Sequence, residues 1–181
     1  MGVTRMRRVI FIDADILIPL FDPDAKSEEV KSAKSLLSQL KHYRERKHYV
    51  IRISQVALAE IFMKILRIFM KNLRHASSIQ KASNLANNVL DAIWKISVEL
   101  EADYPSLKPS VVDLAKELLN EGYVWHFNDA LILAHAMDDR ETEFFLTTDR
   151  NILESYKLEE WVNEYRRKCE MKKMRIAEVL P

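Results

Sequence analysis

The chain has 181 residues, of which 48% are apolar and 30% charged, and its formal net charge at pH 7 is +1. This composition is ordinary for a soluble globular protein, so we expect residues 1–181 to form a single domain. The single Cys169 excludes an internal disulfide framework and a cysteine-rich metal site. No apolar run approaches the roughly 20 residues needed to span a bilayer, so we expect no membrane contact and a cytoplasmic location.

The two halves of the chain carry opposite net charge. Residues 1–90 hold 16 Lys and Arg against 8 Asp and Glu, a net of +8, whereas residues 91–181 hold 12 against 19, a net of −7. A basic surface beside an acidic cluster suits an enzyme that uses a metal ion on a phosphodiester, because the first attracts phosphates and the second holds cations. The ordinary alternative is that these charged residues lie on solvent-exposed faces of helices, which would give the same numbers of charged residues in each half.

The hydrophobic pattern predicts strands that alternate with helices. In chain order we expect a strand at 9–12, a turn at 22–24, a helix at 27–46, a strand at 48–53, helices at 55–74, 78–100, 111–121 and 128–137, a strand at 143–147, a helix at 158–169 and a strand at 174–180. Ser54 is expected to be the N-cap of the helix at 55–74, and Asn128 is expected to be the N-cap of the helix at 128–137. Gly122 is expected to end the helix at 111–121.

Strands joined by helices predict an α/β fold, with a three-layer α/β/α arrangement around a mostly parallel sheet. Residues 64–104 make a long helical stretch, and we expect them to form an extended helical pair after the second strand. In sheets of this kind, ligands bind beyond the carboxyl ends of the strands.

Acidic residues follow the predicted strands. Asp13 and Asp15 come directly after the first strand, and Asp149 follows the strand FFLTT. Glu60 lies in VALAEIFMKIL, which is apolar on nearly every helical face, and Asp129 lies in the first turn of FNDALILAHAM. Carboxylates at one sheet edge repel each other and raise at least one pKa, unless divalent cations neutralise them. Oxygen ligands without Cys favour a hard ion, Mg²⁺ or Mn²⁺.

Each acid also has an ordinary structural explanation. Asp129 could complement the dipole of its own helix. Asp149 could be a turn residue, and Glu60 could pair with a buried Lys or Arg. Asp13 has fewer such explanations, because it stands between a buried strand and an apolar helix start. The hypothesis of a metal site therefore depends on the acids occurring together.

Four segments, FIDADIL, QVALAEIF, FNDALILAHAM and FFLTTDRNIL, resemble in order and type the four acidic motifs of PIN-domain ribonucleases. This group includes the toxins of many prokaryotic toxin–antitoxin pairs. The resemblance covers most of the chain, from the first strand to about residue 153, and implies a PIN-like fold. It implies that the catalytic, metal-binding acids are Asp13, Glu60, Asp129 and Asp149.

The resemblance also implies roles for neighbouring residues. Thr147 falls on the hydroxyl residue of a T-x-D motif close to the acids. Asp15 stands where the family more often has Ser or Asn, which makes it an auxiliary candidate. Asn151 occupies a place that is commonly acidic, so an auxiliary role there is not expected. The candidates for contacts with the RNA backbone are Lys64, Arg67, Lys71 and Arg74.

The implied activity is metal-dependent hydrolysis of RNA phosphodiester bonds by an endoribonuclease with one or two Mg²⁺ or Mn²⁺ ions. The implied partners are an RNA substrate, an antitoxin protein and a second copy of the chain. Trp125 and Phe127 could stack on unpaired RNA bases, although packing in the core is their expected use. For His126 and His135 we expect structural or surface roles.

Two other interpretations remain open. D-x-D followed by Ile-Leu also resembles the opening of haloacid-dehalogenase phosphatases, but their Gly-Asp motif is absent, because the chain contains only Gly2 and Gly122. The other interpretation is a non-catalytic PIN-like module that binds RNA or a protein. A broken acidic set would indicate such a module, whereas all four acids are present here.

Overall fold

The computed structural model describes residues 8–22, 24–72 and 79–180, and for residues 68–72, 79–83, 85 and 86 it describes the backbone alone. Its four strands form one sheet in the order β2-β1-β3-β4, with β1 at Arg8–Ile12, β2 at Tyr49–Ile53, β3 at Thr142–Leu146 and β4 at Arg175–Ala177. Every pairing in this sheet is parallel. The predicted α/β class and parallel sheet are therefore confirmed.

The longer helices lie close to their predicted ranges. They are α2 (Ser27–Lys47), α3 (Gln55–Asn72), α4 (Ile79–Leu100), α5 (Pro109–Asn120), α6 (Phe127–Asp138) and α8 (Tyr156–Lys168). Three elements too short to show a helical period were not predicted as separate elements: α1 (Ala14–Leu17), the 3-10 helix η1 (Ile18–Leu20) and α7 (Arg150–Leu153). Helices α1 and α7 begin directly after Asp13 and Asp149, so both acids are N-caps.

Two predicted caps are confirmed and one is wrong. Ser54 Oγ accepts a hydrogen bond from Ala57 N at 3.0 Å, and Gly122, with φ +72°, follows the C-cap residue Glu121 of α5. Asn128 is not the N-cap of α6. The carbonyl of His126 already accepts from Ala130 N at 3.0 Å, so the helix begins earlier and Asn128 lies in its first turn. The last strand is shorter than predicted because β4 pairs with only three residues of β3.

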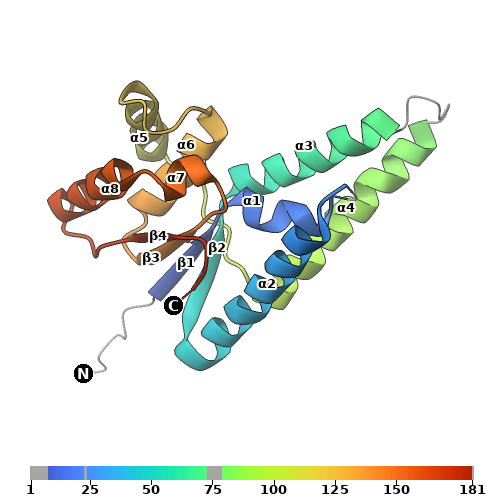
Figure 1. Ribbon diagram of the computed structural model, residues 1–181, viewed down its shortest axis with the longest axis horizontal. Helices are drawn as coiled ribbons and strands as arrows, with labels where there is room; N and C mark the ends of the chain where they lie inside the picture. The colour runs from blue at the N-terminus through green and yellow to red at the C-terminus, as the bar shows by residue number, and fades with distance from the viewer. Residues whose placement is uncertain (1–7, 23, 73–78, 181) are drawn as a thin grey trace.

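The helices cover both faces of the sheet. Helix α2 contacts β2 and α4, whereas α6 contacts β3, α5 and α8. Figure 1 shows α2 and α4 on one side of the strands and α5, α6 and α8 on the other, which is compatible with a three-layer fold. Helices α3 and α4 pack against each other and reach beyond the sheet, so they form the expected helical pair (Figure 1). None of the described helices combines the length and the apolar character that a membrane crossing requires.

A buried arginine holds the end of α6. The side chain of Arg166, on α8, is fully buried and its described hydrogen bonds all go to main-chain carbonyls, at 2.6 to 3.4 Å. The acceptors are Ala136, Met137, Asp139, Arg140, Thr142 and Lys172. The last carbonyls of a helix have no partner within the helix. Arg166 therefore joins the end of α6, the start of β3 and the end of α8.

Helix α4 exposes an apolar stripe. Leu90, Trp94 and Val98 are 50%, 66% and 56% exposed and lie four residues apart, so they share one face of the helix. Asp91 and Lys95 are exposed beside this stripe. We refer to Leu90, Trp94 and Val98 as the α4 stripe.

Candidate active site

A polar pocket lies at the carboxyl edge of the sheet. It has a volume of about 580 Å³ and is lined by Asp15, Glu60, Lys64, His126, Phe127, Asn128, Asp129, Asp149 and Asn151. Three of the four predicted acids therefore line one pocket, although α3, α6 and the segment after β3 supply them separately. The short connections after parallel strands all emerge at this edge, which is why distant acids meet there. We refer to this space as the acidic pocket.

Asp13, the fourth acid, lies beneath this group rather than in the pocket lining. Its side chain is 4% exposed; Oδ1 accepts from Ala14 N, and Oδ2 accepts from the Thr147 hydroxyl, both at 2.6 Å. Burial raises the pKa of Asp13 to about 8; the charges of Asp15 and Asp129 add to this rise, and the two hydrogen bonds oppose it. Ionising Asp13 at neutral pH therefore needs further positive charge nearby.

Thr147 links Asp13 to Asp149. Besides donating to Asp13, its Oγ1 accepts from Asp149 N at 3.1 Å. Asp149 in turn uses Oδ1 to accept from Asn151 N at 2.9 Å and so caps α7. Thr147 thus lies beside the acids, as the T-x-D motif implies, and one hydroxyl fixes the positions of two of them.

Glu60 and Asp129 are carboxylates in partly buried positions beside other acids. Burial raises the pKa of Glu60, with smaller contributions from the charges of Asp129 and Asp15. Burial likewise raises the pKa of Asp129, and Asp15 and Asp149 add to it. Among the described residues Glu60 Oε2 is buried without a hydrogen-bond partner. The alternative that Glu60 pairs with a buried Lys or Arg is therefore wrong for the part of the chain that the structure describes.

Lys64 brings a positive charge to these acids. Its Nζ lies 3.5 Å from Asp15 Oδ1, and its charge lowers the pKa values of Glu60 and Asp129. Arg67, the next candidate for RNA contacts, is exposed on α3 but is not part of the pocket lining. The side chain of Lys71 and all of Arg74 lie outside the described residues. Of the four predicted RNA-binding residues, Lys64 is the one that the structure brings to the acids.

The pocket's donor atoms are of the kind that hard cations prefer. Carboxylate oxygens surround it, and the side chains of Asn128 and Asn151 add amide oxygens. These acids do not form a closed cluster: across residues 8–22, 24–72 and 79–180, no three or more His, Cys, Asp or Glu side chains are arranged to hold a metal ion together. The donor chemistry therefore fits Mg²⁺ or Mn²⁺, and Lys64 is the cation that the structure places there.

Sequence analysis expected no site role for three residues that line this pocket, and for a fourth, Phe127, it left stacking on RNA open but expected packing in the core. Asn128 was predicted as a cap, no role was expected for Asn151, and His126 was given a structural or surface role, yet all three line the pocket. Phe127 also lines it, and it is 49% exposed, so the predicted packing in the core is wrong. Asn128 and Asn151 lie within two residues of predicted acids, and this nearness is the signal that could have found them.

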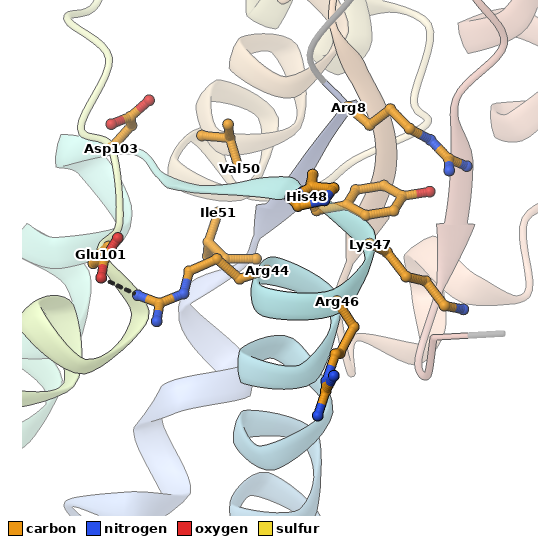
Figure 2. Close-up of a pocket in the computed structure, with 10 residues that line it drawn as sticks. Arg8, Arg44, Arg46, Lys47, His48, Val50, Ile51, Glu101 and Asp103 are labelled. Carbon is orange, nitrogen blue, oxygen red and sulfur yellow. Dashed lines mark ion pairs between the residues drawn. The ribbon is translucent and has the colours of Figure 1, made fainter. Parts of the chain in front are cut away.

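Much of the basic excess in the first half lies away from the acidic pocket. Arg8, Arg44, Arg46, Lys47 and His48 line a different pocket at the amino edge of the sheet. Figure 2 shows Arg44 directed toward Glu101, 2.8 Å from it, while Arg46 and Lys47 point away from each other. Cations in the last turn of α2 complement its dipole, which explains their position there. These cations therefore do not line the acidic pocket, whereas Lys64 does.

The comparisons with known proteins leave the family open. No protein-family model matches the chain, and no curated protein matches it by sequence.

Proposed function

We propose that the protein is a metal-dependent endoribonuclease with a PIN-like active site in the acidic pocket. The observation that supports this proposal is the meeting of Asp15, Glu60, Asp129 and Asp149 around one polar pocket, above the buried Asp13. Acids that only cap helices or fill turns would not need to share a space. Repulsion among these four carboxylates destabilises the fold, and such repulsion is typical of catalytic sites.

The carboxylates would hold Mg²⁺ or Mn²⁺. Glu60 Oε2 is buried without a hydrogen-bond partner among the described residues, and burial, with smaller contributions from neighbouring carboxylates, raises the pKa values of Asp13, Glu60 and Asp129. A bound cation would favour the ionised form of all three acids. A bound divalent cation supplies a water of lowered pKa for attack on phosphorus and stabilises the leaving oxygen. In this proposal Glu60, Asp129 and Asp149 hold the cation from the lining of the pocket, and the buried Asp13 adds a further carboxylate close by.

The remaining polar residues suit a phosphodiester substrate. Lys64 presents an ammonium group to the pocket and can bind a phosphate oxygen once a cation takes over its role beside Asp15. His126 faces the same space and lowers the pKa values of Glu60 and Asp129. Asn128 and Asn151 can donate to phosphate or base oxygens.

A non-catalytic binding module is the second candidate. The observation in its favour is that the described acids do not close into a group that could hold a metal ion. Such a module would bind RNA or a protein at the same pocket without hydrolysing it. Cleavage, measured together with metal binding, separates the two functions.

The test is cleavage of a mixed pool of structured and single-stranded RNAs with Mg²⁺, with Mn²⁺ and with EDTA. We expect cutting with either metal and none with EDTA. Glu60→Gln, which preserves the size of the side chain, should slow cutting by about a hundredfold. The control variant, Asp113→Asn, loses an exposed carboxylate on α5 and should cleave RNA at the parental rate. Cutting that resists EDTA, or that is unchanged in Glu60→Gln, would contradict the proposal, whereas metal binding without cutting would favour the binding module.

We also propose a second copy of the chain as a partner, at the α4 stripe. In an antiparallel pair centred on Trp94, Leu90 meets Val98 of the partner, and Asp91 and Lys95 lie on the side where they can pair across the axis. Trp94→Glu should therefore shift the mass measured by light scattering from dimer to monomer, with unchanged circular dichroism. Equal masses for parent and variant would exclude this interface. The antitoxin partner and the cytoplasmic location remain predictions.

A further inference from the structure

The pocket at the amino edge of the sheet holds more basic than acidic side chains. It has a volume of about 740 Å³, and its lining contains four Arg and Lys side chains against the acids Glu101 and Asp103, which leaves a net charge of +2 with His48 neutral. The four cations are Arg8, Arg44, Arg46 and Lys47. We refer to this space as the basic pocket (Figure 2).

Carboxylates hold two of these four cations. Arg8 donates to both carboxylate oxygens of Glu143, at 2.6 and 2.8 Å. Arg44 Nη1 lies 2.8 Å from Glu101 Oε1, and this is the ion pair drawn in Figure 2. The charges of Arg8 and Arg44 are therefore largely balanced within the protein.

The other two cations are not balanced in this way. Arg46 and Lys47 are the last two residues of α2, and both are exposed. Neither forms an ion pair among the described residues, and the ammonium group of Lys47 lies 4.1 Å from the centre of the Tyr43 ring. Figure 2 shows both side chains directed away from Glu101 and Asp103. They present their positive charge to the solvent.

The end of α8 offers a comparison. This helix also ends on an adjacent Arg and Lys, Arg167 and Lys168, and both are exposed. Arg167 lines a surface pocket that contains three glutamates against two cations, and Lys168 lies 3.0 Å from Glu164. A helix C-terminus carries about half a negative charge, which favours cations but does not balance two of them. The pair on α2, which lacks such neighbouring acids, can therefore bind a further anion.

The acidic pocket indicates which anion this is. Its lining holds four carboxylates and one lysine, so it repels a phosphate backbone until a metal ion binds. A nuclease with such a site needs cations elsewhere to hold its substrate. Arg and Lys side chains bind phosphate oxygens, and the planar guanidinium group does so through two N–H groups at once.

We infer that the basic pocket binds backbone phosphates of the same RNA molecule that the acidic pocket cleaves, at a distance from the cleaved bond. The inference rests on the proposed function and adds a second contact region for its substrate. Strand β1 runs from Arg8, at the basic pocket, to the residue before Asp13, and five residues at 3.3 Å each span about 16 Å. The bound RNA must therefore extend well beyond the cleaved bond. Backbone contacts carry no sequence information, so this contact raises affinity for RNA of any sequence.

The test compares two matched double variants. Arg46→Gln/Lys47→Gln removes the unpaired cations of α2, and Arg167→Gln/Lys168→Gln removes the same two residue types from the end of α8. Both proteins lose the same charge at a helix C-terminus, and circular dichroism checks that both are folded. Binding of a fluorescein-labelled RNA of about 20 nucleotides is measured by anisotropy in EDTA, where the proposed nuclease cannot cut, at several salt concentrations.

The α2 variant should bind this RNA about tenfold more weakly than the parent at low salt. Its plot of log K against log salt concentration should be shallower by about 1.4, because each lost phosphate contact removes about 0.7 from the slope. In Mg²⁺ the α2 variant should have a KM raised by about tenfold and an unchanged kcat, because a contact far from the cleaved bond is the same in the ground state and the transition state. The α8 variant should match the parent in all three measurements.

Equal affinity and equal salt slopes for the two double variants would overturn the inference and leave the basic pocket to an acidic protein. Weaker binding with an unchanged KM would also overturn it, because the bound RNA would not be the molecule that is cleaved. If the parent cuts RNA with metal and both variants keep its KM, the inference alone fails. If the α2 variant loses affinity but no protein cuts, the proposed function fails and the phosphate contact stands. If the parent neither binds nor cuts RNA, both fail.

Discussion

Replacing Arg166 with leucine is expected to lower the free energy of unfolding by about 3–5 kcal/mol, or roughly 10 °C in Tm. Leucine fills part of the volume but leaves six main-chain carbonyls without the guanidinium that now donates to them. Each buried carbonyl left without a partner costs about 1–3 kcal/mol unless water replaces it. Urea unfolding followed by circular dichroism measures the change.

The matched control is the adjacent residue. Arg167 is exposed in the last turn of α8, so Arg167→Leu should change the free energy of unfolding by no more than about 0.5 kcal/mol. Arg166→Lys should fall near the leucine variant, because an ammonium group cannot reach carbonyls in so many directions. Equal stability of the two leucine variants would show that the carbonyls find other partners.

Replacing Asp13 with asparagine is expected to stabilise the metal-free protein at pH 8 while it reduces RNA cleavage by at least about a hundredfold. The stabilisation should be about 2–4 kcal/mol, because the buried carboxylate has a pKa of about 8 in the folded state and the asparagine side chain carries no charge. Asparagine can still accept from Ala14 N and can donate to the Thr147 hydroxyl. The positioning of Thr147 and Asp149 should therefore survive the change.

The sign of the pH dependence follows from the raised pKa. Between its unfolded value of 3.8 and about pH 8, Asp13 holds its proton more tightly in the folded state. The contribution of Asp13 to stability is therefore complete below about pH 4 and falls as the pH rises toward 8, and Asp13→Asn should remove this contribution to the slope. The raised pKa values of Glu60 and Asp129 add slope in the same direction, whereas the lowered pKa values of His135 and Glu143 act in the opposite direction. Parallel pH profiles for parent and variant would contradict the assignment.

Added metal should reverse the order of stability. Mg²⁺ bound beside ionised Asp13 offsets the cost of its charge, so millimolar Mg²⁺ should raise the Tm of the parent more than that of Asp13→Asn at pH 8. Asp113→Asn, which alters an exposed acid, should respond to Mg²⁺ like the parent. An equal response in all three proteins would place the bound metal elsewhere.

Long periodic elements could be predicted from the sequence, and short ones could not. Both ends of α2, the start of α3 and the end of α4 lie within one residue of their predicted positions, because the apolar residues of these helices recur over many positions. The predicted end of α3 at 74 and the predicted start of α4 at 78 lie outside the described residues. Helices α1 and α7 are single turns that a capping aspartate begins, which leaves no period to detect. The hydrogen bonds of the Arg166 side chain could not be predicted either. Their acceptors are main-chain carbonyls between positions 136 and 172, and a main-chain acceptor does not depend on the type of side chain at its position.

The acids of the site were predictable for a different reason. Asp13, Glu60 and Asp129 stand in apolar segments. Burying a carboxylate there costs free energy, so each of these positions indicated a functional role. Asn128, Asn151 and Phe127 are ordinary at their positions, and only the fold shows that they face the same pocket. The exposure of Trp125 could not be predicted either, because a bulky aromatic residue in a short turn is usually buried.

The central position of β1 sets the order in which the protein can be built during synthesis. Strand β1 is made first, yet its partner β3 and the hydroxyl that binds Asp13 come 134 positions later along the chain. A nascent chain can pair β1 with β2 early, but it has no means to place β3 beside β1 until β3 has left the ribosome. Any truncated product that stops before β3 therefore exposes one edge of a buried strand and lacks Asp149. The catalytic arrangement that we propose can exist only in a chain that extends through Asp149.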